Sequence, residues 1–247
     1  MESYFFEAFE NMNRLAPGSY TSTKRAAELY PDRTKDMKIL DIGCGNGEHT
    51  LLLATLFPNA MITAIDNNEA FIQTLNEAIA SQGLSSRITT YCMSMFEIPF
   101  EKHSFDLIWS EGSIYIAGFK KGLNDWRSLL KPDGWLICSE ISWLTDSPNE
   151  EARSFWEEAY QEMNTVSAKI EDSKAAGYEM KGHFVLPPSD WTTEYYEPLQ
   201  KNLNRMKTKY RANEEAKQAI QMIESEIQLY KSYGSDYSYV FYGMKNN

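Results

Sequence analysis

The chain has 247 residues, of which 43% are hydrophobic and 24% charged, a composition ordinary for a soluble globular protein with one substantial core. Its formal net charge of −11 comes from 24 Lys and Arg against 35 Asp and Glu. Such a charge repels phosphate backbones and anionic membrane surfaces, and no dense basic run offsets it. We therefore expect neither nucleic acid nor a membrane as a partner.

Cysteine usage and the N-terminal stretch indicate a cytoplasmic protein. Cys44, Cys92 and Cys138 are scattered and form no CxxC pair, so we expect buried free thiols rather than disulfides or zinc ligands. No His, Cys and carboxylate spacing indicates a metal site. The first residues are acidic and amphipathic, unlike a signal peptide, and no stretch has the length of a membrane span. A monomer and a homodimer both remain open.

Hydrophobic periodicity predicts two helices and then an alternation of strands and helices. The helices are expected over residues 3–13 and 21–30. Short apolar strands follow at residues 38–42, 60–65, 88–92, 105–109 and 135–140. Helices separate them at residues 47–57 and 69–82, and another ends over 123–130. This alternation predicts an α/β fold with a doubly wound, mostly parallel sheet covered on both faces.

After residue 148 the regular alternation of short strands and helices ends. Helices are expected over residues 150–164 and 167–176, a strand over 178–186, a helix-rich block over 191–233 and a final strand over 237–244. We interpret the block as a helical insertion before the last strand. The expected organisation is an N-terminal helical cap (1–35), an α/β core (36–190 and 235–247) and a helical lid (191–234) within the same domain. Cap and lid are amphipathic, so we expect both to cover the carboxyl edge of the sheet.

The strongest motif is Ile39-Leu40-Asp41-Ile42-Gly43-Cys44-Gly45-Asn46-Gly47, a strand that runs into a loop with three glycines and then a helix. Glycine lets the backbone approach a ligand closely and adopt positive φ angles, and amides at the helix start can face that ligand. In a doubly wound fold this loop lies at the carboxyl end of the first strand, where ligands bind. A glycine-rich turn without a ligand is the alternative.

Asp66 ends the second strand, where a carboxylate can accept both hydroxyls of an adenosine ribose. Nicotinamide enzymes place an acid similarly, but their GxGxxG loop needs a small residue where this chain has Glu48. Asp41, inside the first motif, either orders the loop or meets an ammonium group of the ligand. A pyrophosphate there would be repelled, so these residues favour a positively charged ligand over a dinucleotide.

Four segments together resemble class I S-adenosylmethionine-dependent methyltransferases over residues 36–142. They are residues 41–47, Asp66, Phe-Asp-Leu-Ile-Trp-Ser at 105–110 and Leu-Leu-Lys-Pro-Asp-Gly-Trp at 129–135. Trp-Ser-Glu-Gly at 109–112, with the aromatic tail, resembles the ubiquinone-biosynthesis-like group (methyltransferase type 11/25). The resemblance implies a seven-stranded Rossmann-like methyltransferase sheet, with S-adenosylmethionine as cofactor and S-adenosylhomocysteine as product.

The resemblance also implies roles for individual residues. The first-motif glycines would contact the methionine part of the cofactor, and Asp66 its ribose. Ser94 and Met95 stand where the family usually has an acid and its neighbour for the adenine, so recognition there would use the Ser94 hydroxyl and the Met95 backbone. The expected cofactor-binding residues are Asp41, Gly43, Cys44, Gly45, Gly47, Asp66, Asn67, Ser94, Met95 and Ser110.

Methyl transfer from a sulfonium is an in-line displacement with an activated donor, so orientation and exclusion of water contribute most. A general base is needed only if the acceptor must lose a proton. Glu111 is the first candidate for acid/base or orienting chemistry, with capping of the following helix as its alternative. Tyr115 either faces the substrate or packs. His183, inside a strand, is a candidate base or a hydrogen-bonded structural residue.

Three aromatic residues are candidates for acceptor binding. Trp143 either stacks on the acceptor or lies at a seam between elements. Tyr195 and Tyr196 follow a Pro-Pro-Ser-Asp turn and are expected to reach the acceptor. The sequence thus predicts methyl transfer to a small-molecule acceptor. A non-catalytic S-adenosylmethionine-binding module, a protein-modifying enzyme and, less favoured because of Glu48, an NAD(P)-dependent oxidoreductase remain as alternatives.

Overall fold

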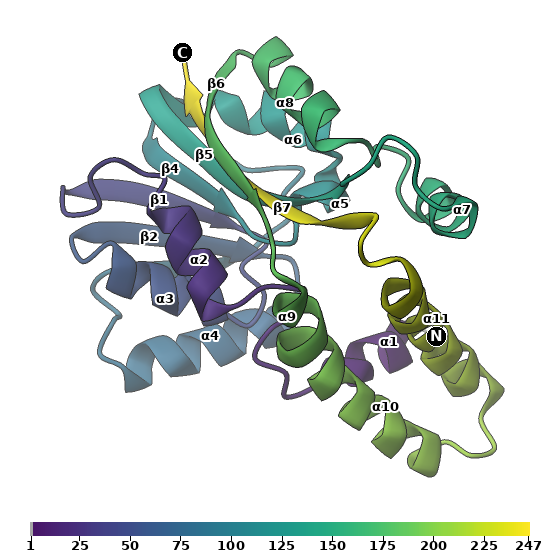
Figure 1. Ribbon diagram of the computed structural model, residues 1–247. Coiled ribbons are helices and arrows are strands. Elements are labelled where there is room, and N and C mark those ends of the chain that lie inside the picture. Colours follow the sequence, from purple (N-terminus) through teal and green to yellow (C-terminus); the bar gives the residue numbers. More distant parts are fainter. Residues whose placement is uncertain (1) are drawn as a thin grey trace.

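The computed structural model describes residues 2–247, and its core is a seven-stranded sheet in the order β3-β2-β1-β4-β5-β7-β6 (Figure 1). The strands are β1 (Met37–Ile42), β2 (Ala60–Asp66), β3 (Ile88–Cys92), β4 (Phe105–Ser110), β5 (Leu130–Trp143), β6 (Tyr178–Val185) and β7 (Tyr237–Asn246). Strands β1 to β5 pair in parallel, and β7 runs antiparallel to both β5 and β6. The expected seven-stranded, mostly parallel Rossmann-like sheet is confirmed.

Helices cover both faces of this sheet. They are α1 (Glu2–Ala8), α2 (Tyr20–Ala27), α3 (Glu48–Leu56), α4 (Glu69–Ser81), α5 (Ile114–Ala117), α6 (Phe119–Arg127), α7 (Glu150–Ala159), α8 (Val166–Ala175), α9 (Pro188–Trp191), the π-helix η1 (Thr192–Tyr196), α10 (Glu197–Lys209) and α11 (Glu214–Tyr233). In Figure 1, α2, α3 and α4 lie on one face of the sheet and α6 and α8 on the other.

The apolar run in β1 follows from this two-sided cover. Successive strand residues point to opposite faces, so Ile39 packs in the buried cluster that contains Leu53 of α3, and Leu40 in the cluster that contains Leu123 of α6. Both are fully buried. A central parallel strand therefore needs an apolar residue at nearly every position, as the sequence has.

Some elements differ from the sequence-based expectation. The first helix ends at Ala8 instead of residue 13, and α5 was not expected. Strand β5 begins at Leu130, because that residue pairs with Phe105 before an irregularity in the register around the turn at residues 131–134. Cys92 is exposed rather than buried, since β3 is one of the two edge strands of the sheet.

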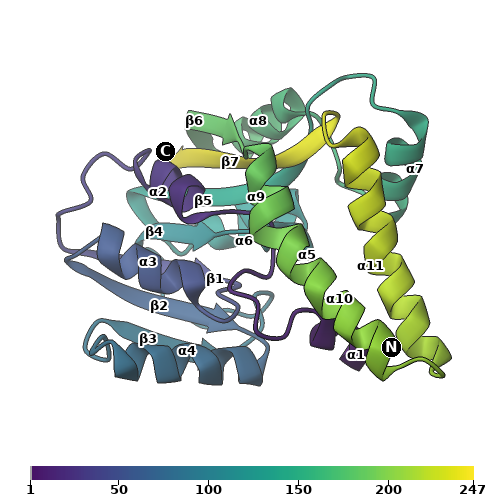
Figure 2. The same ribbon diagram turned by 60° about the horizontal axis from the view of Figure 1, so that its bottom comes forward.

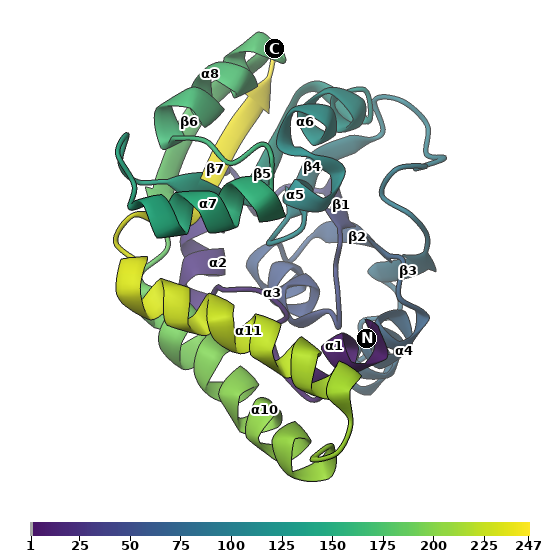
Figure 3. The ribbon, with the colours of Figure 1, turned by 90° about the vertical axis from the view of Figure 1, so that its right-hand side faces the viewer.

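The helical insertion between β6 and β7 begins at Pro188, three residues before its expected boundary at 191. Helices α10 and α11 pack against each other, and α1 packs against both (Figures 2 and 3). The Asn202 amide of α10 donates hydrogen bonds to the carbonyls of Ala8 and Glu10, at 2.8 and 2.9 Å. One buried cluster contains Ala8, Ile39 and Ile220, so cap, core and insertion share a continuous interior. Among residues 2–247, no helix combines the length and apolarity that crossing a bilayer requires.

Candidate active site

Two adjoining cavities lie where β1, β2 and β4 end. The loop cavity, about 360 Å³, is lined by segments 43–46, 65–68, 93–96 and 111–113, and by residues 13–17 from the N-terminal side. The aromatic cavity, about 280 Å³, lies beside it, bordered by α1, α7, α11 and η1. The same six residues line both cavities: Phe6, Leu15, Ala16, Pro17, Phe71 and Tyr115.

The three glycines of the first motif serve different purposes. Gly43, Gly45 and Gly47 all have positive φ angles, of 75°, 52° and 90°. A Cβ on Gly43 would lie 2.5 Å from the Ser113 side chain, and one on Gly47 would lie 2.2 Å from Leu75 of α4. Both glycines are therefore required by packing. Gly45 and Gly43 line the loop cavity and Gly47 does not.

Asp66 lies at the end of β2 and lines the loop cavity. Its Oδ2 accepts a hydrogen bond from the Gly45 amide, and its Oδ1 accepts one from the Asn68 amide, both at 2.9 Å. A carboxylate has about four lone-pair sites, so these two bonds leave capacity for a ligand. The side chain thus fixes the glycine loop and also faces the cavity that the loop borders.

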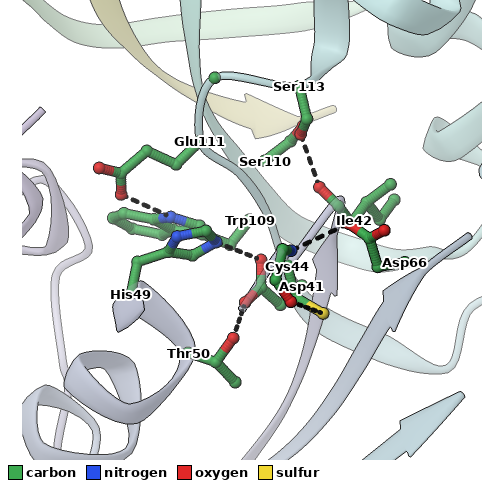
Figure 4. A network of polar contacts seen from close by, with 12 residues as sticks. Asp41, Ile42, Cys44, His49, Thr50, Asp66, Trp109, Ser110, Glu111 and Ser113 are labelled. Carbon is green, nitrogen blue, oxygen red and sulfur yellow. Dashed lines mark hydrogen bonds and ion pairs between the residues drawn. The ribbon is translucent and has the colours of Figure 1, made fainter. Parts of the chain in front are cut away.

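Asp41 lines neither cavity and is fully buried. Its carboxylate accepts a hydrogen bond from the Thr50 hydroxyl at 2.6 Å and lies 3.3 Å from Nε2 of His49 (Figure 4). Burial alone would lower the pKa of His49, but the Asp41 carboxylate leaves that pKa raised. Of the two roles considered for Asp41, this geometry supports ordering of the loop and of the start of α3.

A second network joins the loop to the turn after β4. The Ser110 hydroxyl lies 2.8 Å from that of Ser113, which donates to the carbonyl of Ile42 at 2.8 Å (Figure 4). The Gly112 amide donates to the Ser139 hydroxyl of β5 at 2.7 Å. Ser113 lines the loop cavity, whereas Ser110, expected to bind the cofactor, lies behind it.

Glu111 borders the loop cavity, but its carboxylate is occupied by protein donors. Arg14 donates to Oε1 at 2.6 Å, the Thr23 hydroxyl lies 3.0 Å from both oxygens, and the Trp109 indole lies 3.3 Å from Oε2. The Glu111 side chain is only 3% exposed. These bonds attach residues 13–19, here called the N-terminal strap, to the turn after β4. The contacts favour this structural role over the acid/base role expected for Glu111, and Glu111 does not cap α5, which begins at Ile114.

Tyr115 and Tyr195 both line the aromatic cavity, as expected of acceptor-facing residues. Burial raises the pKa of the Tyr115 hydroxyl, and the Glu226 and Glu140 carboxylates raise it further. Burial also raises the pKa of Tyr195 well above its usual value, with a further contribution from Glu226. Both phenols are therefore protonated near neutral pH, which makes them hydrogen-bond donors and not bases.

Tyr160, another lining residue, connects the aromatic cavity to a buried ion pair. Its hydroxyl donates to Oε1 of Glu140 at 2.7 Å, and the Lys169 ammonium donates to the same oxygen at 2.5 Å. Glu140 and Lys169 are 0% and 1% exposed as side chains. Burial raises the pKa of Glu140, although Lys169 opposes that change. Within residues 2–247, the second oxygen of Glu140 has no hydrogen-bond partner.

Three expected site residues lie elsewhere. His183 belongs to β6, the edge strand farthest along the sheet from β1, where it is exposed and stacks on Tyr242 with ring centroids 6.3 Å apart. Trp143 is buried against Tyr237 and lines neither cavity, so the alternative role at a seam between elements fits it better. Tyr196 points its hydroxyl to Glu226 instead of into the aromatic cavity.

The structure adds residues that sequence reasoning did not propose. The strap residues at 13–17 and Phe71 line the loop cavity, and Glu226 lines the aromatic one. The strap has no motif that marks it. Glu226 carries a usable signal, because it lies on the apolar stripe of α11, three residues after Ile223 and four before Tyr230. A carboxylate at such a position indicates a special environment.

Comparisons with known proteins agree with the methyltransferase resemblance found in the sequence. The model of the methyltransferase domain family matches residues 33–206. The chain is 26% identical over 186 residues to sterol 24-C-methyltransferase erg-4 of Neurospora crassa, covering 70% of this chain and 48% of that protein. It is 32% identical over 93 residues to 27-O-demethylrifamycin SV methyltransferase of Amycolatopsis mediterranei, covering 38% and 34%. The chain thus spans half or less of the length of these curated relatives.

Among solved structures, an S-adenosylmethionine-dependent methyltransferase from Geobacter sulfurreducens, in complex with S-adenosylhomocysteine, superimposes with a TM-score of 0.83. The two sequences are 16% identical, and the alignment covers 100% of this chain and 99% of that one. The fold is therefore that of class I S-adenosylmethionine-dependent methyltransferases. The chain belongs to the methyltransferase domain family, and the resemblance found in its sequence is confirmed.

Proposed function

We propose that this protein is an enzyme that transfers a methyl group from S-adenosylmethionine to a small-molecule acceptor. The observation that carries the proposal is the pair of adjoining cavities, one bordered by the glycine loop and Asp66, the other lined mostly by aromatic residues. Because Tyr115 borders both, a group held in the first cavity can face a group held in the second. Membership of the methyltransferase domain family supports the same reaction.

The residues of the loop cavity fit this cofactor. Asp66 offers unoccupied carboxylate lone pairs to ribose hydroxyls, as in the loop geometry described above. Phe71 and Met95 supply apolar walls suited to the adenine ring. Arg14 lines the same cavity, and the guanidinium donors that Glu111 and Thr23 leave free can meet the carboxylate of an amino-acid ligand. Its volume of about 360 Å³ lies within the ordinary range for ligand pockets.

When bound, the cofactor supplies a methyl group already activated on a sulfonium. The work left to the protein is to orient the acceptor and exclude water. Leu15, Ala16 and Pro17 of the strap, together with Phe6, line both cavities. Tyr115 and Tyr195, kept protonated, can donate hydrogen bonds to the acceptor from the aromatic side. The volume of the aromatic cavity, about 280 Å³, favours a small acceptor.

The alternatives find less support. A dinucleotide-binding enzyme would place a pyrophosphate at the glycine loop, where Glu48 also lines the cavity and would repel it. A module that only binds the cofactor would have no use for a second cavity beside the first. The aromatic cavity therefore favours an enzyme over a sensor.

The decisive experiment has two stages. Calorimetry should show binding of S-adenosylmethionine and S-adenosylhomocysteine, and none of NAD. Incubation with S-adenosylmethionine and fractionated small metabolites should then form S-adenosylhomocysteine and one methylated product, with Asp66→Ala as the negative control. Failure to bind either cofactor form would refute the proposal, and binding without turnover on any fraction would favour the sensor.

A further inference from the structure

Within residues 2–247, the aromatic cavity is lined by a single side chain that can carry a formal charge near neutral pH. Of the described residues that line it, Glu226 is the one that is ionisable as an acid or base near neutral pH, and no Lys, Arg or His is among them. The others are aromatic, aliphatic or small: Phe5, Phe6, Phe9, Leu15, Ala16, Pro17, Phe71, Tyr115, Ile141, Trp156, Ala159, Tyr160, Trp191, Tyr195 and Tyr239. Whatever occupies this space meets aromatic faces and one carboxyl group.

Glu226 has little compensation from the protein itself. Among residues 2–247 its one hydrogen bond comes from the Tyr196 hydroxyl, 2.9 Å from Oε1, and it takes part in no ion pair. Lys169, a buried lysine of α8, is already bound to Glu140. An ionised carboxylate in an apolar wall is unfavourable unless it is paired. The missing partner is a positive charge, and the cavity is where such a charge can enter.

Resting on the proposed methyl transfer, we propose that the acceptor is a small amine, whose ammonium group pairs with Glu226 and whose apolar body fills the aromatic cavity. Aromatic faces attract cations, and the effect grows when water is excluded. A carboxylate or phosphate on the acceptor would meet Glu226 without any neutralising side chain. The amine is the group by which the acceptor is recognised, whichever of its atoms receives the methyl group.

A competing possibility follows from the environment of the same carboxyl group. Burial raises the pKa of Glu226, although the Tyr196 hydrogen bond opposes the rise. A protonated Glu226 would donate a hydrogen bond to a neutral acceptor instead of pairing with a cation. The two cases predict opposite preferences between an alcohol and an amine of the same shape, so matched probes separate them.

The test uses three probes with one aromatic body: 2-phenylethylamine, 2-phenylethanol and 3-phenylpropanoate. Each is titrated at pH 7.5 into protein saturated with S-adenosylhomocysteine, and binding is followed by calorimetry and saturation-transfer NMR. We expect the amine to bind about tenfold tighter than the alcohol, as a buried charge-assisted hydrogen bond allows, and the acid to bind weakest. Glu226→Gln should remove the preference for the amine.

The control is Glu224→Gln, which removes the same charge two residues earlier on α11. Glu224 pairs with Lys207 at 2.6 Å and does not line the cavity, so the ranking of the probes should persist. Affinity for S-adenosylhomocysteine, measured first on all three proteins, shows that each is folded. Its absence in the wild type would count against the methyltransferase proposal alone.

Two results would overturn the amine inference while leaving the methyltransferase proposal intact. One is wild-type protein that binds the amine no tighter than the alcohol, including no measurable binding of either. The other is a Glu226→Gln variant that binds S-adenosylhomocysteine normally and keeps the full preference for the amine. The wild-type ranking is decisive by itself even if the variant fails to fold.

Discussion

The guanidinium of Arg14 lies 2.6 Å from the carboxylate of Glu111, a contact between residues 97 positions apart in the chain. Arg14 belongs to the N-terminal strap and Glu111 to the turn after β4, so the pair holds the cover of the loop cavity to the sheet. Both side chains are nearly buried, at 9% and 3% exposure. Opening of the cavity for cofactor exchange therefore requires that the Arg14–Glu111 contact break, or that the strap and the turn after β4 move together.

Arg14→Met tests this relationship. Removing one partner of a buried pair leaves the other charge uncompensated, which costs about 3 kcal/mol of unfolding free energy. We expect faster proteolysis within the strap and faster dissociation of S-adenosylhomocysteine, measured by stopped flow. Arg205→Met removes an exposed pair with Glu10 and is the matched control, with an effect below about 1 kcal/mol. Equal proteolysis of Arg14→Met and wild type would contradict the tether.

Asp66→Ala should weaken binding of S-adenosylmethionine by about 1–3 kcal/mol, the range for loss of a charged acceptor to buried hydroxyls. The same change removes the acceptors of the Gly45 and Asn68 amides, so the loop should also loosen. Asp66→Asn keeps one acceptor oxygen, and its loss should be smaller. Calorimetry that finds the same affinity for all three proteins would remove Asp66 from the cofactor site.

Two glycines of the loop should differ in their effect on cofactor binding, because Gly45 lines the loop cavity and Gly47 does not. Gly47→Ala should lower the unfolding free energy, because the new Cβ meets Leu75 at 2.2 Å and the φ angle of 90° is unfavourable for alanine. Gly45→Val should abolish cofactor binding, since its side chain enters the loop cavity beside Leu15, and should also lower stability, because the φ angle at this position is 52°. Denaturant unfolding and calorimetry on both variants check this. Normal cofactor affinity in the Gly45→Val protein would show that the cofactor does not bind against Gly45.

Lys169→Met should be among the most destabilising single changes, by about 3–5 kcal/mol, since it leaves Glu140 buried without a cation. Burial already raises the pKa of Glu140, and the loss of Lys169 raises it further. A group with a raised folded-state pKa is less costly when protonated, so the deficit should shrink between pH 8 and pH 5. Lys174→Met, an exposed pair on the same helix, is the control, with an effect below about 1 kcal/mol.

Two glutamates of α11 should respond to pH with opposite signs. Burial raises the pKa of Glu226 above its ordinary value of 4.5, so the folded state binds the proton of this group more tightly than the unfolded chain does. The free energy of unfolding therefore falls as pH rises from 4.5 through the raised pKa. For Glu224 burial acts in the same direction, but the hydrogen bonds from Lys207 and Gln200 and the charges of Lys207 and Lys231 together lower the pKa, so stability is lost as pH falls below 4.5.

Denaturant unfolding between pH 4 and pH 8 measures both effects. Glu226→Gln should be more stable than wild type at pH 8, and this advantage should fade toward pH 4. Glu224→Gln should be slightly less stable than wild type at pH 8, and that deficit should fade in acid. Parallel curves for the two variants would contradict the different environments assigned to them.

Periodicity was sufficient to predict the sheet from sequence, because buried parallel strands are apolar at both faces and the glycine loop marks the end of β1. Gly43, Asp66 and Met95 line the loop cavity as expected, since they follow strands whose carboxyl ends meet at one edge. Their contacts with the cofactor remain predictions. Glu111 follows such a strand too, yet its partner comes from the N-terminal strap, which no local pattern reveals.

His183 shows a different limit. Its strand was recognised, but the position of β6 at the edge of the sheet depends on the antiparallel insertion of β7 between β5 and β6. Strand order is set by long-range packing and not by the residues of β6 alone. Sequence reasoning did not identify Glu226 for a related reason. Its place in a cavity wall depends on the aromatic residues of α1, α7 and η1 that line the same cavity.

The strap also has a consequence for how the protein is made. The Gly18 amide donates to the carbonyl of Asp190, and the Ser22 hydroxyl donates to its carboxylate at 2.5 Å, while the segment before the strap is bound by Asn202. These anchors leave the ribosome long after residues 13–22 do. During synthesis residues 8–22 therefore stay unpacked until the helices that bind them, α9 and α10, have been made. A translating chain that has passed β4 still lacks these anchors, so the strap can be fixed over the loop cavity only after Asp190 and Asn202 have been made.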